Sequence, residues 1–590
     1  MSLKGRVSIF LLVSLVSIWL GFFAFSEKEI HSYYMMTIYY ILTFQLLIWF
    51  VSLFNVLKSI KGNIAWPEFL LDKTRAFFKE NCIAVCLLMI LLTIGFSICK
   101  PDYRILSDEA IILSDTKSLY ESKSIFTSTA TIYKDNGRQM MFNYYIDKRP
   151  LLFQYFVSLI HSLKGYDPAN IFIANYIAGI ATLFLFYYMV KLKYGKKWGL
   201  LSAVLLCSYP LFLLYTSSAG VELFNLFCSL LLFLLIYKFI ENPVACWAEI
   251  LILWVPLMAQ SRYESILSLF VVLWVIYFYL PKYEYEKFSY KVLLLPIFCV
   301  PIPWLRTISD SAIWWENRNP KDIFCVRFIW DNFRHAIEFF FTENSSYGII
   351  SGVSCIAILG LIIAVYKLFT KQLKKEYIIY WFSVFIFYFL HALVRFMYVD
   401  VDFRHPSASR LALIFLPIIA FSAVYFLIQC QKAMNYKVVH YIIFVLICLL
   451  PYLYWPKLLG NNCGYNELLG YNEFKCIREV LKEYFADKRK YCVITSSPLR
   501  LIPLEYSSID VNMYLRQKHI MDKCIKDGIF KYYVIIQRFH KGKPNFHIPD
   551  SLDSKLVIEK TLNEDFKVMF WQCDSKSFNE SEKLLEKNKK

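Results

Sequence analysis

The chain has 590 residues, of which 58% are hydrophobic and 18% aromatic, and its mean hydropathy is +0.45. This composition excludes an ordinary soluble domain, because apolar stretches long enough to cross a bilayer recur along most of the sequence. The formal net charge of +18 would suggest a nucleic-acid partner in a soluble protein. Here much of the positive charge lies in short loops between apolar runs, where it sets membrane orientation. We therefore expect membrane lipids, and no nucleic acid, as partners.

The apolar runs predict a mainly α, polytopic bundle of about thirteen transmembrane helices. The first run begins with Lys4 and Arg6, stays apolar to Phe25 and shows no small-residue cleavage site, which favours a retained span over a signal peptide. The expected spans are 7–26, 35–56, 81–98, 170–190, 198–216, 220–240, 247–261, 264–280, 291–304, 347–367, 377–395, 409–429 and 437–455.

Lysine and arginine in the short loops predict the sidedness of these spans, because cytosolic loops carry an excess of both residues. Counted from a cytosolic N-terminus, every short basic loop falls inside, namely 57–80, 191–197, 281–291, 367–375 and 431–437. The opposite loops 99–169, 305–346 and 396–408 are longer and richer in acids and Trp. We expect a multi-pass protein of a bacterial inner or plasma membrane, with these long loops and the C-terminal tail outside.

The tail after residue 455 differs in composition from the rest of the chain. It is polar and holds short β-like runs, "KYCVITSS", "KYYVIIQRF" and "FKVMFWQC", separated by helical segments such as "NEFKCIREVLKEYF". This alternation predicts a small extracytoplasmic α/β domain. One or two disulfides are compatible with an exported location, with pairings that sequence does not give. No Cys/His spacing typical of a metal site occurs in the chain.

These patterns divide the chain into three parts. Residues 1–80 hold two N-terminal spans and a cytosolic loop, 81–455 form the main transmembrane module with its three outer loops, and 456–590 form the soluble domain.

An acidic pair, Asp108 and Glu109, opens the stretch "ILSDEAIILSDTKSLYESKS" in the first outer loop. Ser107 suits the N-cap of a helix that begins here, and the helix dipole then favours ionised carboxylates in its first turn. Two interpretations stay open. The acids either start an interfacial helix that lies on the membrane surface, or carry chemistry.

A basic pair, Lys148 and Arg149, precedes Pro150 and the short apolar segment "LLFQYFVSLIHSL". Pro suits the first turn of a helix, and this helix is too short to span, which predicts a re-entrant or interfacial segment. Cations at its entrance suit an anionic lipid headgroup. Ordinary snorkelling of long basic side chains is the alternative.

Further charges occur at the outer ends of later spans. Glu222 begins one span, and Arg262 and Glu264 lie at the end of another. A carboxylate at the edge of the hydrocarbon is costly without a partner or a function, so we expect either substrate binding or structural ion pairs near the interface, and a Glu222–Arg262 contact would satisfy both. Arg395, Arg404, His405 and Arg410 surround a short outer loop, and several Arg beside a membrane favour phosphate recognition. The alternative is a solvated loop balanced by Asp400 and Asp402.

Together, "DEA", "DKRPLLFQYFVSLIHSLKGYDPANIFIANYIAG" and "SSAGVELFNLF" resemble the GT-C fold glycosyltransferases. The resemblance is greatest to the family-39-like group, which contains protein O-mannosyltransferases and the aminoarabinose transferase acting on lipid A. It covers residues 81–280 well and the later spans loosely. Two extra spans precede the motif-bearing one, and Arg149 replaces the commoner Pro.

The resemblance implies transfer of a sugar from a polyprenyl-phosphate donor to an acceptor hydroxyl of a lipid, glycan or protein, with inversion. Asp108 would then act as the base, oriented by Glu109. Lys148, Arg149, Arg404 and Arg410 would bind the donor phosphate. The sugar or acceptor would contact Glu222, Arg262, Glu264 and His405. Because phosphate is a good leaving group, the mechanism requires no cofactor, although a divalent metal is compatible with it.

Two other functions compete with this one. A transporter or flippase would place ionisable residues near mid-span and show internal repeats, whereas the charges here gather at span ends. A ligase-type transferase with a diphosphate-linked lipid donor would rely on outer-loop Arg and His, which Arg404, His405 and Arg410 provide.

Overall fold

The computed structural model describes residues 3–61, 66–134, 139–310, 324–342, 349–370, 375–399, 401–434, 465–466, 468–549 and 552–575. The chain divides into two compact units. Unit 1 comprises Met1–Asp102, Lys148–Val157 and Ile171–Gly464, and unit 2 comprises Tyr103–Asp147, Ser158–Asn170 and Tyr465–Lys590.

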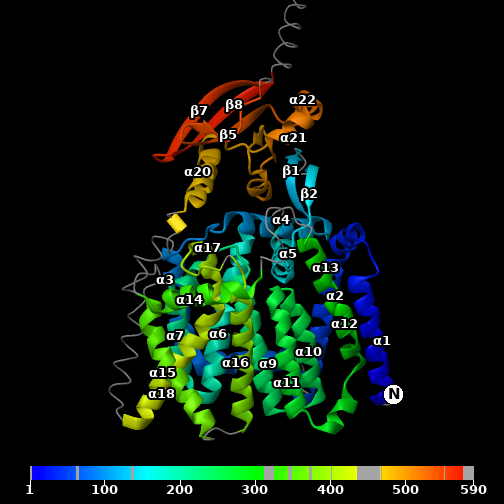
Figure 1. Cartoon of the computed structure of the whole chain (residues 1–590), viewed down its shortest axis with the longest axis vertical. Helices are drawn as coiled ribbons and strands as arrows, with labels where there is room; N and C mark the ends of the chain where they lie inside the picture. The colour runs from blue at the N-terminus through cyan, green and yellow to red at the C-terminus, as the bar shows by residue number, and fades with distance from the viewer. Residues whose placement is uncertain are drawn as a thin grey trace, which may run out of the picture. The chain divides into compact units, whose positions relative to one another are not determined.

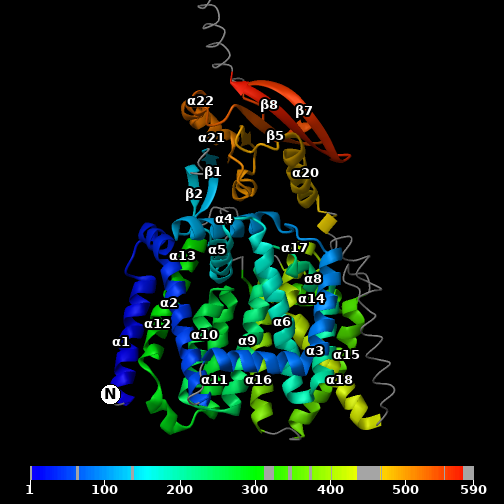
Figure 2. The same cartoon turned by 180° about the vertical axis from the view of Figure 1, so that it is seen from behind.

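Unit 1 is a bundle of helices that run side by side (Figures 1 and 2). Its first half contains α1 (Leu3–Phe22), α2 (Glu27–Lys61), α3 (Trp66–Ile98), α6 (Asn170–Tyr194), α7 (Lys196–Ser208), α8 (Pro210–Thr216), α9 (Glu222–Glu241) and α10 (Ala245–Ala259). Its second half contains η1 (Tyr263–Leu267), α11 (Ser268–Tyr279), η2 (Lys282–Lys287), η3 (Tyr290–Leu294), α12 (Leu295–Cys299), α13 (Pro301–Asp310), η6 (Val326–Phe328), α14 (Ile329–Phe341), α15 (Ile349–Phe369), α16 (Lys375–Phe396), α17 (Pro406–Ser409), η7 (Arg410–Phe415) and α18 (Leu416–Met434).

Within the described residues, nine helices are long and apolar enough to cross a membrane. They correspond to nine of the thirteen expected spans, so the helical, multi-pass architecture is confirmed and the number thirteen is not. The nine helical segments are Gly5–Phe22, Glu27–Lys58, Phe78–Ile98, Asn170–Tyr194, Glu222–Glu241, Tyr290–Ile308, Gly352–Phe369, Tyr377–Phe396 and Pro406–Lys432.

The other four expected spans differ for identifiable reasons. The run 198–216 is a pair of helices, α7 and α8, bent by 74°, because Pro210 lacks a backbone N–H and restricts the residue before it. The runs 247–261 and 264–280 form the shorter apolar helical segments Ala245–Ala259 and Tyr263–Tyr279. The run 437–455 lies outside the described residues.

Unit 2 contains a mixed sheet whose strand order is β2-β1-β4-β3-β5-β8-β7, with β6 paired to β5. β3 pairs in parallel with β4 and β5, and the other pairs are antiparallel. The strands are β1 (Thr127–Tyr133), β2 (Gln139–Tyr145), β3 (Tyr491–Ile494), β4 (Ser508–Ile509), β5 (Tyr532–His540), β6 (Lys543–Pro544), β7 (Leu552–Asn563) and β8 (Phe566–Ser575). The sheet therefore takes two strands from residues 99–169 and six from the tail.

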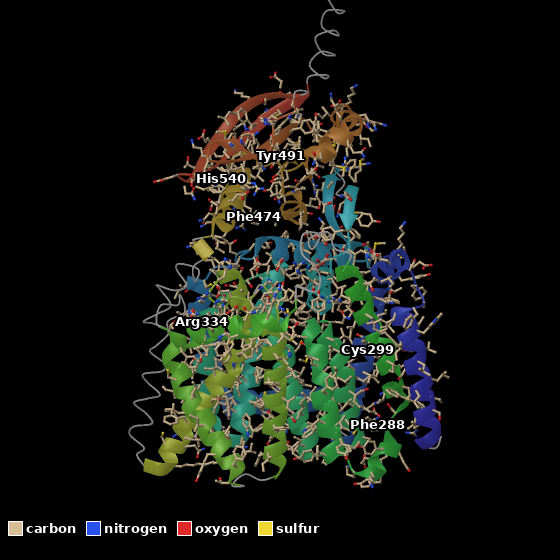
Figure 3. The ribbon with its side chains drawn as sticks, in the orientation of Figure 1. Phe288, Cys299, Arg334, Phe474, Tyr491 and His540 are labelled. Atoms are coloured by element: carbon tan, nitrogen blue, oxygen red, sulfur yellow. The ribbon has the colours of Figure 1, made fainter. Side chains whose placement is uncertain are left out.

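Helices accompany this sheet, and both sequence segments share one core. The helical elements are α4 (Leu106–Ser122), α5 (Leu152–Lys164, divided between the units), α20 (Leu469–Tyr484), η9 (Pro498–Arg500), η10 (Ile502–Leu504), α21 (Val511–Arg516) and α22 (Lys518–Lys526). Ala130 and Ile132 of β1 are buried in the same apolar cluster as Ile494 of β3 and Ile535 of β5. In Figure 3, Phe474 marks α20 and Tyr491 marks β3.

The three strands expected in the tail are present as β3, β5 and β8, and the expected helix is α20. This confirms a mixed sheet domain at the C-terminal end. Among the described residues of the tail, Cys476, Cys492, Cys524 and Cys573 are all free thiols. Cys463 lies outside the described residues.

Candidate active site

Glu222 stands at the start of α9, where a tight loop positions it. Asn175 of α6 donates from Nδ2 to the carbonyls of Ser218 and Gly220, at 2.7 and 2.8 Å. A Cβ atom at position 220 would lie 2.5 Å from Oε2 of Glu222. A side chain at position 220 would therefore have to displace the carboxylate of Glu222.

Arg262 joins Glu222 to Glu264. Its Nη1 lies 3.3 Å from Oε1 of Glu222, and its Nε lies 2.9 Å from Oε1 of Glu264. The predicted Glu222–Arg262 contact is therefore confirmed. One guanidinium presents donors in a fixed fork and can bind two carboxylates at once.

Two further arginines complete a cluster that we call the arginine cluster. Arg395, at the end of α16, lies 3.1 Å from Oε1 of Glu264, and Nε of Arg410, at the start of η7, lies 3.4 Å from Oε1 of Glu222. The members are Glu222, Arg262, Glu264, Arg395 and Arg410. Three guanidinium groups face two carboxylates, so the cluster carries one excess positive charge when all five are ionised.

The cluster also contains unused hydrogen-bonding capacity. Glu222 is buried, and its Oε2 has no hydrogen-bond partner among the described residues. His391, one turn before Arg395 on α16, is fully buried, and neither ring nitrogen has a partner in the described part of the chain. Buried polar atoms without partners are costly, which favours a ligand at this position.

The basic pair Lys148–Arg149 lies beside the loop that carries Arg262. The hydroxyl of Tyr263 donates to the carbonyl of Lys148, and the N–H of Leu152 donates to the carbonyl of Gln260 at 2.8 Å. Both bonds lie within unit 1. The backbone therefore brings together two of the segments that sequence assigned to substrate binding.

Arg404 and His405 have local partners instead. Arg404 pairs with Asp402 at 2.8 Å and with Glu338 of α14 at 2.5 Å, and it is 45% exposed. Glu338 is also bonded by Arg334, whose position on α14 is labelled in Figure 3. His405 accepts from the N–H of Ser407 and thereby caps α17. The pairing of Arg404 with Asp402 agrees with the alternative interpretation, a solvated loop whose positive charges are balanced by acidic residues.

The acidic pair lies in unit 2, in the first turn of α4. Asp108 is half-buried and Glu109 is fully buried. Oε2 of Glu109 accepts the backbone N–H groups of Arg104 and Ile105, at 2.5 and 3.2 Å. The helix begins at Leu106 with Ile105 as N-cap, so the expectation that Ser107 caps it is wrong. Glu109 caps the helix instead, because its side chain reaches back along the chain and accepts backbone N–H groups at the helix start.

Buried polar contacts hold α4 in place within unit 2. Oδ1 of Asp115 accepts the hydroxyl proton of Thr127 at 2.6 Å. The ammonium of Lys117 lies 4.5 and 4.3 Å from the ring centroids of Tyr133 and Tyr166, and 3.4 Å from Oε1 of Glu505. Burial lowers the pKa of Lys117. The helix that carries Asp108 is thus held against β1 and against a turn of the tail at Glu505.

His161, on the same side of α4, has a defined tautomer. Thr116 donates its hydroxyl proton to the carbonyl of Leu113, so its oxygen accepts from Nε2 of His161 at 3.2 Å. Nδ2 of Asn170 then donates to Nδ1 at 3.0 Å. This arrangement requires a neutral ring, and burial lowers the pKa of His161 to about 4.

We expect acid to destabilise unit 2 through His161. The pKa rises from about 4 in the folded state to about 6.5 when unfolded, so between these values the unfolded state binds a proton and the folded state does not. The free energy of unfolding should fall by about 2 kcal/mol between pH 7.5 and pH 5 from this group. Thermal unfolding of the purified protein at both pH values measures it.

The variant His161→Gln, which does not titrate, should lose this part of the pH dependence. His519→Gln, at an exposed position on α22, serves as the control and should keep it. An unchanged pH dependence in His161→Gln would contradict the assignment.

The described residues contain no group of three or more His, Cys, Asp or Glu side chains arranged to hold a metal ion.

Residues 148–305 match the model of the family described as dolichyl-phosphate-mannose-protein mannosyltransferase. The matched segment contains Lys148, Arg149, Glu222, Arg262 and Glu264. The predicted resemblance to GT-C glycosyltransferases is confirmed over this segment, and with it the predicted class, membrane glycosyltransferases that take a sugar from a lipid phosphate.

Solved structures show weaker likeness. ArnT from Cupriavidus metallidurans bound to undecaprenyl phosphate is 10% identical, with a TM-score of 0.49, and the alignment covers 84% of this chain and 98% of that one. The oligosaccharyltransferase of Archaeoglobus fulgidus tethered with an acceptor peptide is 10% identical, with a TM-score of 0.45, covering 78% and 69%. No curated protein matches the chain. At these values the likenesses carry no information on substrates.

Proposed function

We propose that the chain transfers a sugar from a polyprenyl-phosphate donor to an acceptor hydroxyl on the extracytoplasmic face of the membrane, with inversion. The observation that carries the proposal is the coincidence of the family match with the arginine cluster. Residues 148–305 supply Glu222, Arg262 and Glu264, and Arg395 and Arg410 add the excess positive charge. An anionic leaving group is what such an excess can stabilise.

The reaction exchanges one bond at the anomeric carbon for another. The acceptor oxygen attacks this carbon from the face opposite the phosphate, the carbon–oxygen bond to the phosphate breaks, and polyprenyl phosphate leaves with the electron pair. A base must take the hydroxyl proton. We assign this role to Asp108, with Glu109 as the residue that fixes the start of α4 through its backbone hydrogen bonds.

The phosphate would be bound by Lys148, Arg149 and Arg410, and Arg404 stays a candidate that first has to leave Asp402 and Glu338. The tether from Tyr263 to the carbonyl of Lys148 supports this grouping, because it joins the basic pair to the loop of Arg262.

The sugar or acceptor would contact Glu222, whose Oε2 can accept a hydroxyl proton. Arg262 and Glu264 would hold Glu222 in position, and His405 stays a candidate at the outer loop. A divalent metal is compatible with the reaction but is not required by it.

The positions of these charges also weigh against a transporter. Glu222, Arg262, Glu264, Arg395 and Arg410 all lie at the ends of helices or in the turns between them. A transporter would be expected to hold its ionisable residues near mid-span.

The test of the proposal is product release. Purified protein in vesicles should release polyprenyl phosphate from a labelled polyprenyl-phosphate sugar when acceptor is supplied. Because the reaction requires no divalent metal, the release should persist without added metal and in the presence of EDTA. Turnover with a diphosphate-linked donor and none with the monophosphate would overturn the proposal in favour of a ligase-type reaction.

Lys148→Met should raise the donor KM by roughly tenfold or more, because loss of a hydrogen bond to a charged group costs about 1.5–3 kcal/mol. We expect a smaller change in kcat, since the base is retained. Lys164→Met, an exposed lysine at the other end of α5, is the matched control. Equal donor KM values in the two variants would remove Lys148 from donor binding.

A further inference from the structure

A cavity of aromatic and apolar side chains lies within unit 1, between α6, α9, α16 and α18. It holds about 680 Å³ of space, part of which is open to the outside of the helices. Its walls include Tyr194, Tyr237, Tyr377, Tyr380, Trp381 and Phe421.

The cavity extends from the ends of these helices that are far from the arginine cluster, at Tyr237 and Tyr377, to Tyr388 and Pro417, each seven residues from a member of the cluster, Arg395 or Arg410. α9 begins with Glu222 in the cluster, and Tyr237 follows fifteen residues later, which at roughly 1.5 Å per residue is about 22 Å along the axis. α16 starts near Tyr377, at the cavity, and ends with Arg395, in the cluster. The basic loops predict that the cavity end faces the cytosol. The end of the cavity at Tyr237 and Tyr377 is therefore distant from the site proposed for transfer.

Among the described residues that line the cavity, Lys193 is the cation. Its ammonium lies 3.4 Å from the ring centroid of Tyr377 and 5.8 Å from that of Trp381. No carboxylate lies within salt-bridge distance of it among the described side chains, whereas the neighbouring Lys191 and Lys196 both pair with Glu80, at 3.0 and 3.3 Å. The exposed Lys432, at the end of α18, adds a second positive charge that acts on Lys193.

We propose that this cavity is a binding site for an anionic phospholipid of the adjacent leaflet, with one acyl chain between the aromatic walls and the phosphate held by Lys193 and Lys432. Charge complementarity selects the headgroup, because two cations here lack a described acidic partner and cytosolic leaflets are rich in anionic lipid. Stacked rings such as Trp381 and Phe421, 4.7 Å apart, offer a flat apolar surface to the chain.

The experiment uses the full chain in vesicles with photoactivatable phosphatidylglycerol, whose acyl chain carries a diazirine, and peptide mapping of the crosslinks. Labels are expected on the helix segments that line the cavity, around Tyr194, Leu234 and Phe421. Phosphatidylcholine with the same chain should label them less. Lys193→Met, which keeps an apolar stem, should reduce the preference for phosphatidylglycerol about fivefold, as expected for one cation near a membrane surface.

Lys58→Met, which removes an exposed cation at the end of α2, is the matched control and should leave labelling unchanged. Leu234→Trp, which fills the cavity, should abolish labelling by both lipids. Equal labelling of wild type and Lys193→Met, or equal labelling by the two lipids, would overturn the proposal. Stronger labelling by a photoactivatable undecaprenyl phosphate than by phosphatidylglycerol would overturn the choice of occupant. None of these readouts depends on sugar transfer, so the failure of either proposal leaves the other standing.

Discussion

Asp108→Asn should lower the rate of sugar transfer by about 10²–10⁴-fold, which is the usual contribution of a positioned general base. The substitution keeps the size and shape of the side chain but removes its capacity to take the acceptor proton. Asp108 lies in the first turn of α4, half-buried, where the helix dipole favours the ionised form that a base requires. Single-turnover rates with labelled donor measure the effect, and thermal unfolding checks that the variant is folded.

The neighbouring acid should behave differently. Glu109 is fully buried and accepts two backbone N–H groups, so Glu109→Gln should lower the thermal stability of unit 2 and reduce the rate less than Asp108→Asn. Asp487→Asn, on the surface of the same unit and paired with Lys490, should change neither quantity. Near-normal turnover in Asp108→Asn would remove this residue from the mechanism.

Hydropathy predicted the transmembrane helices well because burial in lipid requires a long, continuous apolar run. The prediction failed where an apolar run was too short to span the membrane or was interrupted by a residue that breaks the helix. The run around Tyr209–Pro210 has the composition of one span but contains a residue that cannot continue the helix, and α7 and α8 meet there at 74°. The runs around α10 and α11 are apolar yet short, and composition alone does not separate them from full spans.

The sheet of unit 2 was only partly predictable. The tail strands β3, β5 and β8 were visible as short apolar or alternating runs, but β1 and β2 of the outer loop were not recognised. Their sequence does contain the dipeptide Asn136–Gly137 between alternating apolar residues, which is a strong hairpin signal. What no local pattern could give is the pairing of Thr131 with Ser508, because it joins segments far apart in the chain.

In the candidate site, too, contacts between residues far apart in the chain were hard to predict. Glu222 and Arg262 were predicted to meet because both lie at the same predicted face of the membrane, where an unpaired carboxylate is costly. The partner of Glu264 was missed. Arg395 lies in the last turn of α16, more than a hundred residues later, and only the packing of α16 beside η1 brings the two within 3.1 Å. His391 was missed because a lone histidine in an apolar run gives no local signal.

Glu264→Gln should destabilise unit 1 by about 3–5 kcal/mol, the usual cost of removing one partner from a buried charge pair. The Glu264 side chain is only 8% exposed, and its Oε1 binds both Arg262 and Arg395. Without the negative charge, two guanidinium groups would face each other with Glu222 as the nearest carboxylate. Thermal unfolding in detergent measures the loss, and the exposed pair Lys238–Glu241 provides the control, because Glu241→Gln should cost about 0–1 kcal/mol.

A double variant separates the destabilisation caused by an unpaired buried charge from the contribution of the Glu264–Arg395 pair to the free energy of unfolding. Arg395→Met removes the cation that Glu264 neutralises on α16, so Glu264→Gln combined with Arg395→Met should be more stable than Glu264→Gln alone. Additive losses in the double variant would mean that Glu264 and Arg395 act independently. Glu264 would then not act as the counterion of Arg395, and the contacts of the arginine cluster would not leave the single excess positive charge that is assigned to the leaving phosphate.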